Sequence, residues 1–196
     1  RSYSPPSAGA WTLRPGQEVQ CGTVLVTFDQ VADNAFYVPC DNTEDGIFFD
    51  TERFIPGLVS DSGQFAGAFI AAHEWVHLIQ ARGGEANDTS VTLELQADCY
   101  AGAYAAHIAQ DGVPFELTTR DIDVALAALI GVADPVGIDQ TVPGAHGSAF
   151  DRISAFTTGF GDVQACTSFQ TEPPPIFQMK FTEAEEANQG NLDAVT

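Results

Sequence analysis

The sequence predicts an α+β domain that is mainly helical, and three observations support this class. Residues 60–82 are apolar nearly all round at helical spacing, which is typical of a central buried helix. Residues 88–110 lie between a Ser/Asp helix start and an Asp-Gly-Pro stop, which indicates a second helix. The Val- and Thr-rich stretch 17–29 precedes both and is typical of a strand. With 196 residues, 44% of them hydrophobic, the chain is long enough for one substantial core.

The chain opens on a segment that we expect to be an N-terminal tail, residues 1–16. Prolines break regular structure there: Pro5, Pro6 and Pro15. Further on, residues 36–39 and 46–50 flank CDNTEDG, whose turn-forming residues predict a hairpin. An extended peptide can add to an exposed sheet edge through main-chain hydrogen bonds. IFFD at 47–50 is the nearest candidate for such a strand, and an ordinary core strand is an equally good interpretation.

The first main helix is expected to begin near Ser60–Ser62 and to end before Gly83 and Gly84. Its stripe of apolar residues is Phe65, Phe69, Ala72, Val76 and Ile79. The polar residues beside this stripe, His73, Glu74 and His77, would be costly to bury unless they are paired or bound to a metal.

These three residues form an H-E-x-x-H motif. On a helix, His73 and His77 lie one turn apart on one face, so both imidazoles can bind a single Zn²⁺. Glu74 lies about 100° round the helix from His73 and can reach a water on the metal. A five-residue motif with three specified positions also occurs by chance in ordinary helices. A second motif is therefore needed to support a zinc site.

The second helix supplies that motif, Glu94-Leu95-Gln96-Ala97-Asp98. Glu94 is the candidate third zinc ligand, and Asp98, one turn on, can accept the remaining N–H of a ligating histidine. Small residues on the Glu94 face allow another helix to approach closely: Ala97, Ala101 and Ala105. A buried E-x-x-x-D that makes structural hydrogen bonds between helices is the alternative.

The rest of the chain is expected to be scaffold and loop. Thr118 or Thr119 caps a third helix, DIDVALAALIGV, and a Gly/Pro loop carrying His146 leads into a fourth. After the breaker TEPPPIF, a capping box of Thr182 and Glu185 predicts a short terminal helix, FTEAEEANQG. The resulting division is a tail (1–16), one domain (17–170) and a C-terminal extension packed on it (171–196).

Four cysteines without a C-x-x-C pair argue against a thiolate zinc site and for two disulfides formed in an oxidising compartment. Three pairings are possible. We expect Cys21–Cys40, between neighbouring strands, and Cys99–Cys166, between the second helix and the far end of the fold. Reduced buried cysteines are the alternative.

The charge restricts the partners. With 27 acidic and 7 basic residues, the formal net charge is −20, which disfavours nucleic acid and anionic membranes. No apolar run approaches the length of about eighteen residues that a membrane span requires. The start at Arg1, without Met, is typical of a processed or trimmed chain, which leaves a removed signal or anchor open. We therefore expect a secreted or cell-envelope-exposed protein, and no feature indicates an oligomeric state.

Over residues 19–168, the stretches HEWVHLIQ, LELQADCYAG, HGSAFDRISAFTTGF and ACTSF resemble the bacterial neutral zinc metallopeptidases. They are more distantly similar to the H-E-x-x-H plus E-x-x-x-D peptidases, which include the membrane CAAX-processing group. The resemblance implies a zincin-like domain with a central H-E-x-x-H helix, a second ligand-bearing helix and a small N-terminal hairpin or sheet. By resemblance, the zinc ligands are His73, His77 and Glu94, Glu74 is the catalytic base, and Asp98 supports a ligand from behind. His146 and Arg152 match a third motif, whose His and Arg face the bound substrate, and Arg152 is expected to support the site without binding the metal, by holding the loop or the peptide.

The predicted function is a zinc metalloendopeptidase with one Zn²⁺ per chain and a peptide or protein as its substrate. Zinc polarises the scissile carbonyl, Glu74 takes a proton from water and passes it to the leaving amine, and His146 stabilises the developing oxyanion. One alternative is a zinc-binding but catalytically silent homologue that acts as a surface binding or assembly module. Another is an acidic structural domain without metal. Metal analysis and a peptide library separate the three.

Overall fold

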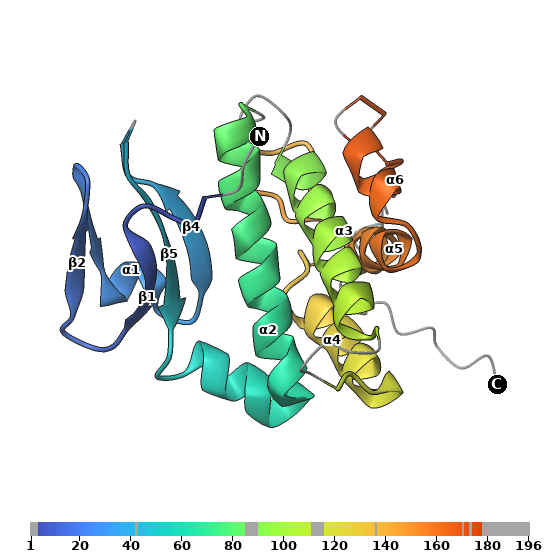
Figure 1. The fold of residues 1–196 in the computed structure, drawn as a ribbon, viewed down its shortest axis with the longest axis horizontal. Coiled ribbons are helices and arrows are strands. Elements are labelled where there is room, and N and C mark those ends of the chain that lie inside the picture. Colours follow the sequence, from blue (N-terminus) through green and yellow to red (C-terminus); the bar gives the residue numbers. More distant parts are fainter. Residues whose placement is uncertain are drawn as a thin grey trace.

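The computed structural model describes residues 4–41, 43–84, 90–110, 116–135, 137–169, 171–172 and 174–177. It is an α+β fold, about half helical, as the sequence predicts. Its strands are β1 (Gly9–Leu13), β2 (Glu18–Cys21), β3 (Val24–Thr27), β4 (Ala35–Pro39) and β5 (Asp45–Asp50). Its helices are α1 (Phe28–Val31), α2 (Phe54–Gly83), α3 (Ser90–Ile108), α4 (Thr119–Gly131), α5 (Ala149–Gly161) and α6 (Val163–Ser168). Figure 1 shows the strands on one flank of α2 and the other long helices on its opposite flank.

The larger sheet has three strands in the order β1-β5-β4. β5 pairs with β4 antiparallel, with Tyr37 opposite Ile47, which confirms the predicted hairpin around residues 40–45. IFFD lies in β5, the central strand, and Ile47 and Phe48 are fully buried, so the core-strand interpretation is the correct one. β1 and β4 are the two edge strands, and β4 packs against α2.

The first thirty residues contain more structure than we predicted. Residues 9–13, inside the expected tail, form β1 and pair parallel with β5, because the prolines border this strand and do not interrupt it. The single strand predicted at 17–29 is a hairpin of β2 and β3 followed by α1. Gly22 turns this hairpin with φ +53°, a left-handed conformation that glycine adopts at little cost.

Helix α2 begins earlier than predicted, at Phe54, and bends at Gly63. Pro56 lies in its first turn, where a missing N–H breaks no helical hydrogen bond. Gly63 has φ 74° and ψ 171°, so it separates a short first arm from the long arm that carries the H-E-x-x-H motif. The long arm ends as predicted, with Gly84 in the left-handed conformation at φ 87°.

Helices α3 and α5 touch through their backbones. A Cβ atom at Gly102 would collide with the Phe156 carbonyl, and one at Gly159 would collide with the Cys99 carbonyl. These two glycines therefore fix the distance between the helix that carries Glu94 and the helix that follows His146. The principal core lies among α2, α3, α4 and α5 and contains Phe65, Phe69, Ala101, Ala105, Leu129 and Phe156.

Both predicted disulfides are present. Cys21–Cys40 ties β2 to the residue after β4, and Cys99–Cys166 ties α3 to α6. All four cysteines are buried. The second bridge begins next to Asp98, so it anchors the segment of α3 that faces the histidines.

The cap predicted at Thr118 or Thr119 is found at Thr118, which accepts from the N–H of Asp121 at the start of α4. Ser148, which was not predicted as a cap, accepts from the N–H of Asp151 at the start of α5. Helix α6 was not predicted, and the expected helix at 181–190 lies outside the described residues.

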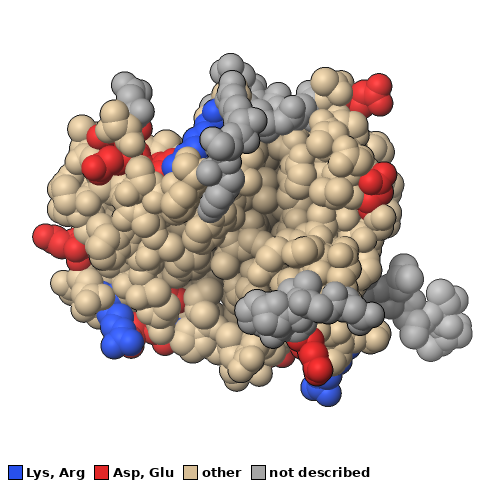
Figure 2. All heavy atoms as spheres, in the orientation of Figure 1, with Lys and Arg blue, Asp and Glu red and all other residues tan. Residues whose placement is uncertain are grey.

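The surface and the helix lengths bear on the predicted partners. In the part of the chain that the structure describes, no helix combines the length and apolar character that crossing a membrane needs. On the face shown in Figure 2, acidic side chains lie at separate points near the rim. The acidic excess visible on that face is therefore dispersed, as on a solvated surface.

Candidate metal centre

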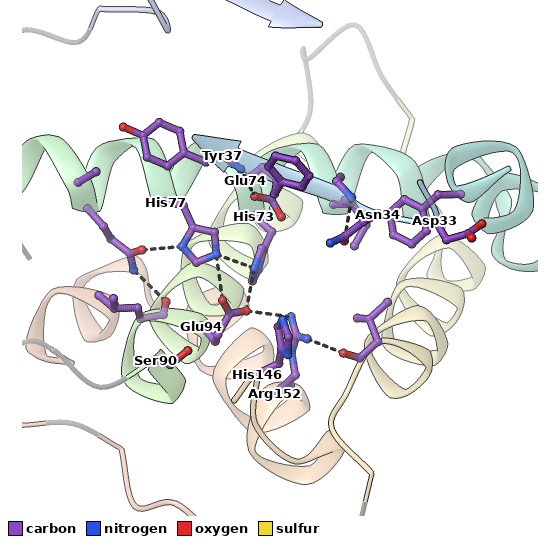
Figure 3. Close-up of a pocket in the computed structure, with 18 of the residues that line it drawn as sticks. Asp33, Asn34, Tyr37, His73, Glu74, His77, Ser90, Glu94, His146 and Arg152 are labelled. Atoms are coloured by element: carbon purple, nitrogen blue, oxygen red, sulfur yellow. Dashed lines mark hydrogen bonds and ion pairs between the residues drawn. The ribbon is translucent and has the colours of Figure 1, made fainter. Parts of the chain in front are cut away.

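Helix α2 holds His73 and His77 one turn apart on the face that looks toward α3. Their Nε2 atoms lie 3.0 Å from each other. His73 is buried, and His77 is partly open to a cleft of about 650 Å³. Figure 3 shows both rings pointing into this cleft, with Glu74 from the same helix beside them. One ligand atom from each of these three residues can be chosen so that all lie within 4.8 Å of one another.

The outer nitrogen of each ring is already bonded. His73 Nδ1 lies 2.9 Å from Asp98 Oδ1, and His77 Nδ1 lies 2.8 Å from Gln80 Oε1. The Gln80 amide nitrogen donates to the Leu93 carbonyl and to Gln96 Oε1, which leaves its oxygen facing His77. Both histidines therefore carry their proton on Nδ1 when neutral, and both direct the lone pair of Nε2 into the cleft.

Glu94, from α3, completes the group. Its Oε2 lies 3.2 Å from His73 Nε2, and its Oε1 lies 3.3 Å from His77 Nε2. Two ring nitrogens and a carboxylate thus converge on one point, an arrangement that a cation satisfies. Nitrogen and carboxylate oxygen are the donors of catalytic zinc sites, so this set fits Zn²⁺.

The pKa values show how strongly this group attracts positive charge. Burial lowers the pKa of His73, but hydrogen bonds to Asp98 and Glu94 outweigh burial and raise it to about 10. Burial raises the pKa of Glu94, but its hydrogen bonds with the two histidines outweigh burial and hold this pKa well below the ordinary value. Both shifts favour positive charge at this point, which is the charge that a bound metal ion would supply.

Glu74 differs from Glu94 in its surroundings. Its Oε2 accepts the backbone N–H of Tyr37, in β4, at 2.9 Å. Burial raises the pKa of Glu74, the change that suits a carboxylate which accepts and returns a proton. The two glutamates of the cleft are thus held differently, one against both imidazoles and the other against the edge strand.

Behind His73, Asp98 is fully buried and paired with Arg152, from α5. Arg152 Nε donates to Asp98 Oδ2 at 2.7 Å, Nη2 donates to Oδ1 at 2.9 Å, and Nη1 donates to the Val132 carbonyl at 3.0 Å. The same carboxylate lies against His73 through its Oδ1 atom, at 2.9 Å from Nδ1. Arg152, expected by resemblance to face substrate, is 2% exposed and is bonded to the group behind the histidine.

His146 lies in the lining of the same cleft, with 56% of its side chain exposed. Asp134, in the turn after α4, accepts the backbone N–H groups of His146 and Gly147 at 2.7 and 2.9 Å. Its other oxygen lies 3.3 Å from His146 Nδ1. The loop that carries His146 is therefore fixed by one carboxylate.

Three residues of the site were missed by sequence reasoning: Gln80, Tyr37 and Asp134. Gln80 is three residues after His77 on one helix face, so its contact could have been found from spacing alone. Tyr37 and Asp134 reach the site only through tertiary folding, and no local pattern marks them.

A family profile described as "Putative neutral zinc metallopeptidase" matches residues 16–169. The chain belongs to this family. Over 68% of its length it is 37% identical to "Uncharacterized protein Rv2575" of Mycobacterium tuberculosis, covering 54% of that protein. It is 34% identical to "Uncharacterized protein YpfJ" of Escherichia coli K12, over 68% of this chain and 53% of YpfJ. The chain thus spans about half the length of these relatives. No solved structure gives a significant match.

Proposed function

We propose that the chain is a zinc-dependent peptidase of the zincin type that hydrolyses internal peptide bonds. The observation that carries this proposal is the convergence of the two Nε2 atoms and the Glu94 carboxylate, with a second carboxylate, Glu74, beside them. A structural zinc site closes all four positions with protein ligands, whereas a hydrolytic site keeps one open. Three ligands facing a cleft match the hydrolytic kind.

His73, His77 and Glu94 would hold one Zn²⁺ per chain. When bound, zinc supplies a Lewis acid that polarises a peptide carbonyl and makes water more acidic. Glu74 takes a proton from the attacking water and passes it to the leaving amine. The N–H of Tyr37 holds Oε2 of Glu74, which leaves Oε1 to receive that proton.

His146 would stabilise the negative charge that develops on the former carbonyl oxygen. Asp134 keeps the Nδ1 proton of His146 in place, so a hydrogen bond donated from Nε2 requires the imidazolium form. The Asp134 carboxylate holds the ring, and His146 donates to the oxyanion when both of its ring nitrogens carry a proton.

The substrate would be a peptide or an unfolded segment of a protein that lies extended in the cleft beside β4. The buried disulfides Cys21–Cys40 and Cys99–Cys166 support folding in an oxidising compartment, so we propose a secreted or envelope-exposed protein.

The Glu74→Gln variant tests this function. Glutamine keeps the size of the side chain and an oxygen for the Tyr37 N–H, but it cannot act as the base. Zinc content measured by mass spectrometry should persist, while hydrolysis of a randomised peptide library falls by about 10²–10⁴-fold. A variant that cleaves as fast as the wild type would contradict the mechanism. A wild type that holds zinc and cleaves nothing would instead support the silent binding module.

A further inference from the structure

The hydrogen-bonding groups of β4 alternate between its neighbour β5 and the cleft. The N–H of Asp50 donates to the carbonyl of Asn34, and the register pairs Phe36 with Phe48. In an antiparallel ladder, alternate residues bond to the partner strand, so residues 34, 36 and 38 bond to β5. Residues 35, 37 and 39 then turn their backbone groups outward. Ala35, Tyr37 and Pro39 all line the cleft.

Every outward position of β4 lacks a free N–H. The N–H of Ala35 donates to Asn34 Oδ1 at 2.9 Å, and the N–H of Tyr37 donates to Glu74 Oε2 at 2.9 Å. Pro39 has no N–H. Within the part of the chain that the structure describes, no hydrogen bond reaches the carbonyl oxygens of Ala35 and Tyr37. The strand edge that faces the cleft therefore offers acceptors only, and Figure 3 shows Asn34 and Tyr37 along the same side of the site.

We propose, on the basis of the peptidase function above, that this acceptor edge determines how a peptide substrate is bound. Substrate N–H groups donate to the carbonyls of Ala35 and Tyr37, and substrate carbonyls form no bond with β4. A peptide that adds to an ordinary sheet edge both donates and accepts at each bonded residue. A peptide bound to β4 makes only half of those bonds. Its N–H groups, and not its carbonyl oxygens, therefore set its position along the cleft.

The acidic side chains that line the cleft are hydrogen-bond acceptors as well. Asp33, Glu74 and Glu94 place carboxylates there, while the guanidinium of Arg152 is committed to Asp98 and Val132. Asn34 removes the donor at Ala35, because its side-chain oxygen accepts the N–H of Ala35. It is thus a specificity-determining residue that touches no ligand of the metal.

Binding of backbone-modified peptides tests the acceptor edge without requiring turnover. The probes are a fluorescent, N-acetylated octapeptide pool and matched pools in which one amide N–H at a time is replaced by an ester oxygen. Affinity for the Glu74→Gln chain, which keeps an oxygen for the Tyr37 N–H, is read by anisotropy. Two ester positions separated by one residue should weaken binding by about 5–10-fold each, as expected for one lost hydrogen bond. Ester pools that all bind as tightly as the amide pool would overturn the proposal.

Two variants of Asn34 provide the matched comparison. Asn34→Leu is similar in size but frees the Ala35 N–H, so it should strengthen binding of the amide pool by about 3–10-fold by restoring a donor. Asn34→Asp keeps an acceptor for that N–H and should bind no tighter than Asn34. Equal affinities for the Leu and Asp variants would contradict the role of Asn34. Peptide binding without ester sensitivity leaves the hydrolytic function standing, whereas no binding of any pool would overturn both.

Discussion

Arg152 donates two hydrogen bonds, of 2.7 and 2.9 Å, to the carboxylate of Asp98, which lies behind the first histidine of the candidate metal centre. Asp98 in turn lies 2.9 Å from His73 Nδ1. A fully buried carboxylate is costly unless a positive charge and hydrogen bonds compensate it, and Arg152 provides both. The orientation of His73 thus depends on a side chain that comes from α5, more than fifty residues away.

Replacing Arg152 by Met should therefore weaken both the fold and the metal site. Removing one partner of a buried ion pair leaves Asp98 uncompensated, which costs about 3–5 kcal/mol in the free energy of unfolding. Loss of support for a ligating histidine should reduce zinc affinity by about 10–100-fold. Urea unfolding and competition with a chromogenic chelator measure the two effects. Arg120→Met, at an exposed position of α4, is the control and should change neither.

The second prediction concerns the ligands themselves. The purified chain should carry about one Zn²⁺, at about 2.0–2.2 Å from two His nitrogens and a Glu oxygen. His73→Ala should abolish binding, and Glu94→Ala should reduce it severely, because two protein ligands rarely hold zinc tightly. Metal analysis and X-ray absorption check occupancy and distances. Full occupancy in the Glu94→Ala protein would show that another residue is the third ligand.

The third prediction concerns the two disulfides. Denatured, unreduced protein should show no thiol to an alkylating reagent, and reduction should lower the thermal midpoint. The larger effect should come from Cys99–Cys166, which closes a loop of 67 residues against 19 for Cys21–Cys40. Paired Cys→Ala variants, Cys99/Cys166 and Cys21/Cys40, separate the contributions. Four reactive thiols in the unreduced protein would refute the pairing and the exported location.

The sequence predicted the helix-borne part of this site well because helical geometry is local. His73 and His77, or Glu94 and Asp98, share a face by spacing alone, and the structure brings the two pairs together. The cap at Thr118 and the helix end at Gly84 are also local features, and both appear where predicted.

The sheet was harder to predict because strand pairing depends on distant residues. Nothing near Gly9–Leu13 marks it as a parallel neighbour of β5, and IFFD has the same composition at the edge or the centre of a sheet. The Val and Thr residues of this region favour one continuous strand, but the turn at Gly22 divides it into β2 and β3. The contact of Asp134 with His146 likewise spans two loops, which no periodicity connects.

The last prediction concerns His146, whose role depends on Asp134. If His146 donates a hydrogen bond to the oxyanion, His146→Ala should lower kcat and kcat/KM together by about 10²–10³-fold, with KM and zinc content nearly unchanged. Asp134→Asn keeps an oxygen for the backbone N–H groups of His146 and Gly147 but removes the carboxylate that lies against His146 Nδ1. It should therefore lower kcat less than His146→Ala does and leave the loop in place. In the double variant the effects should not add, because Asp134 acts through His146. Additive losses, or a His146→Ala effect confined to KM, would instead indicate that His146 only helps to bind the substrate.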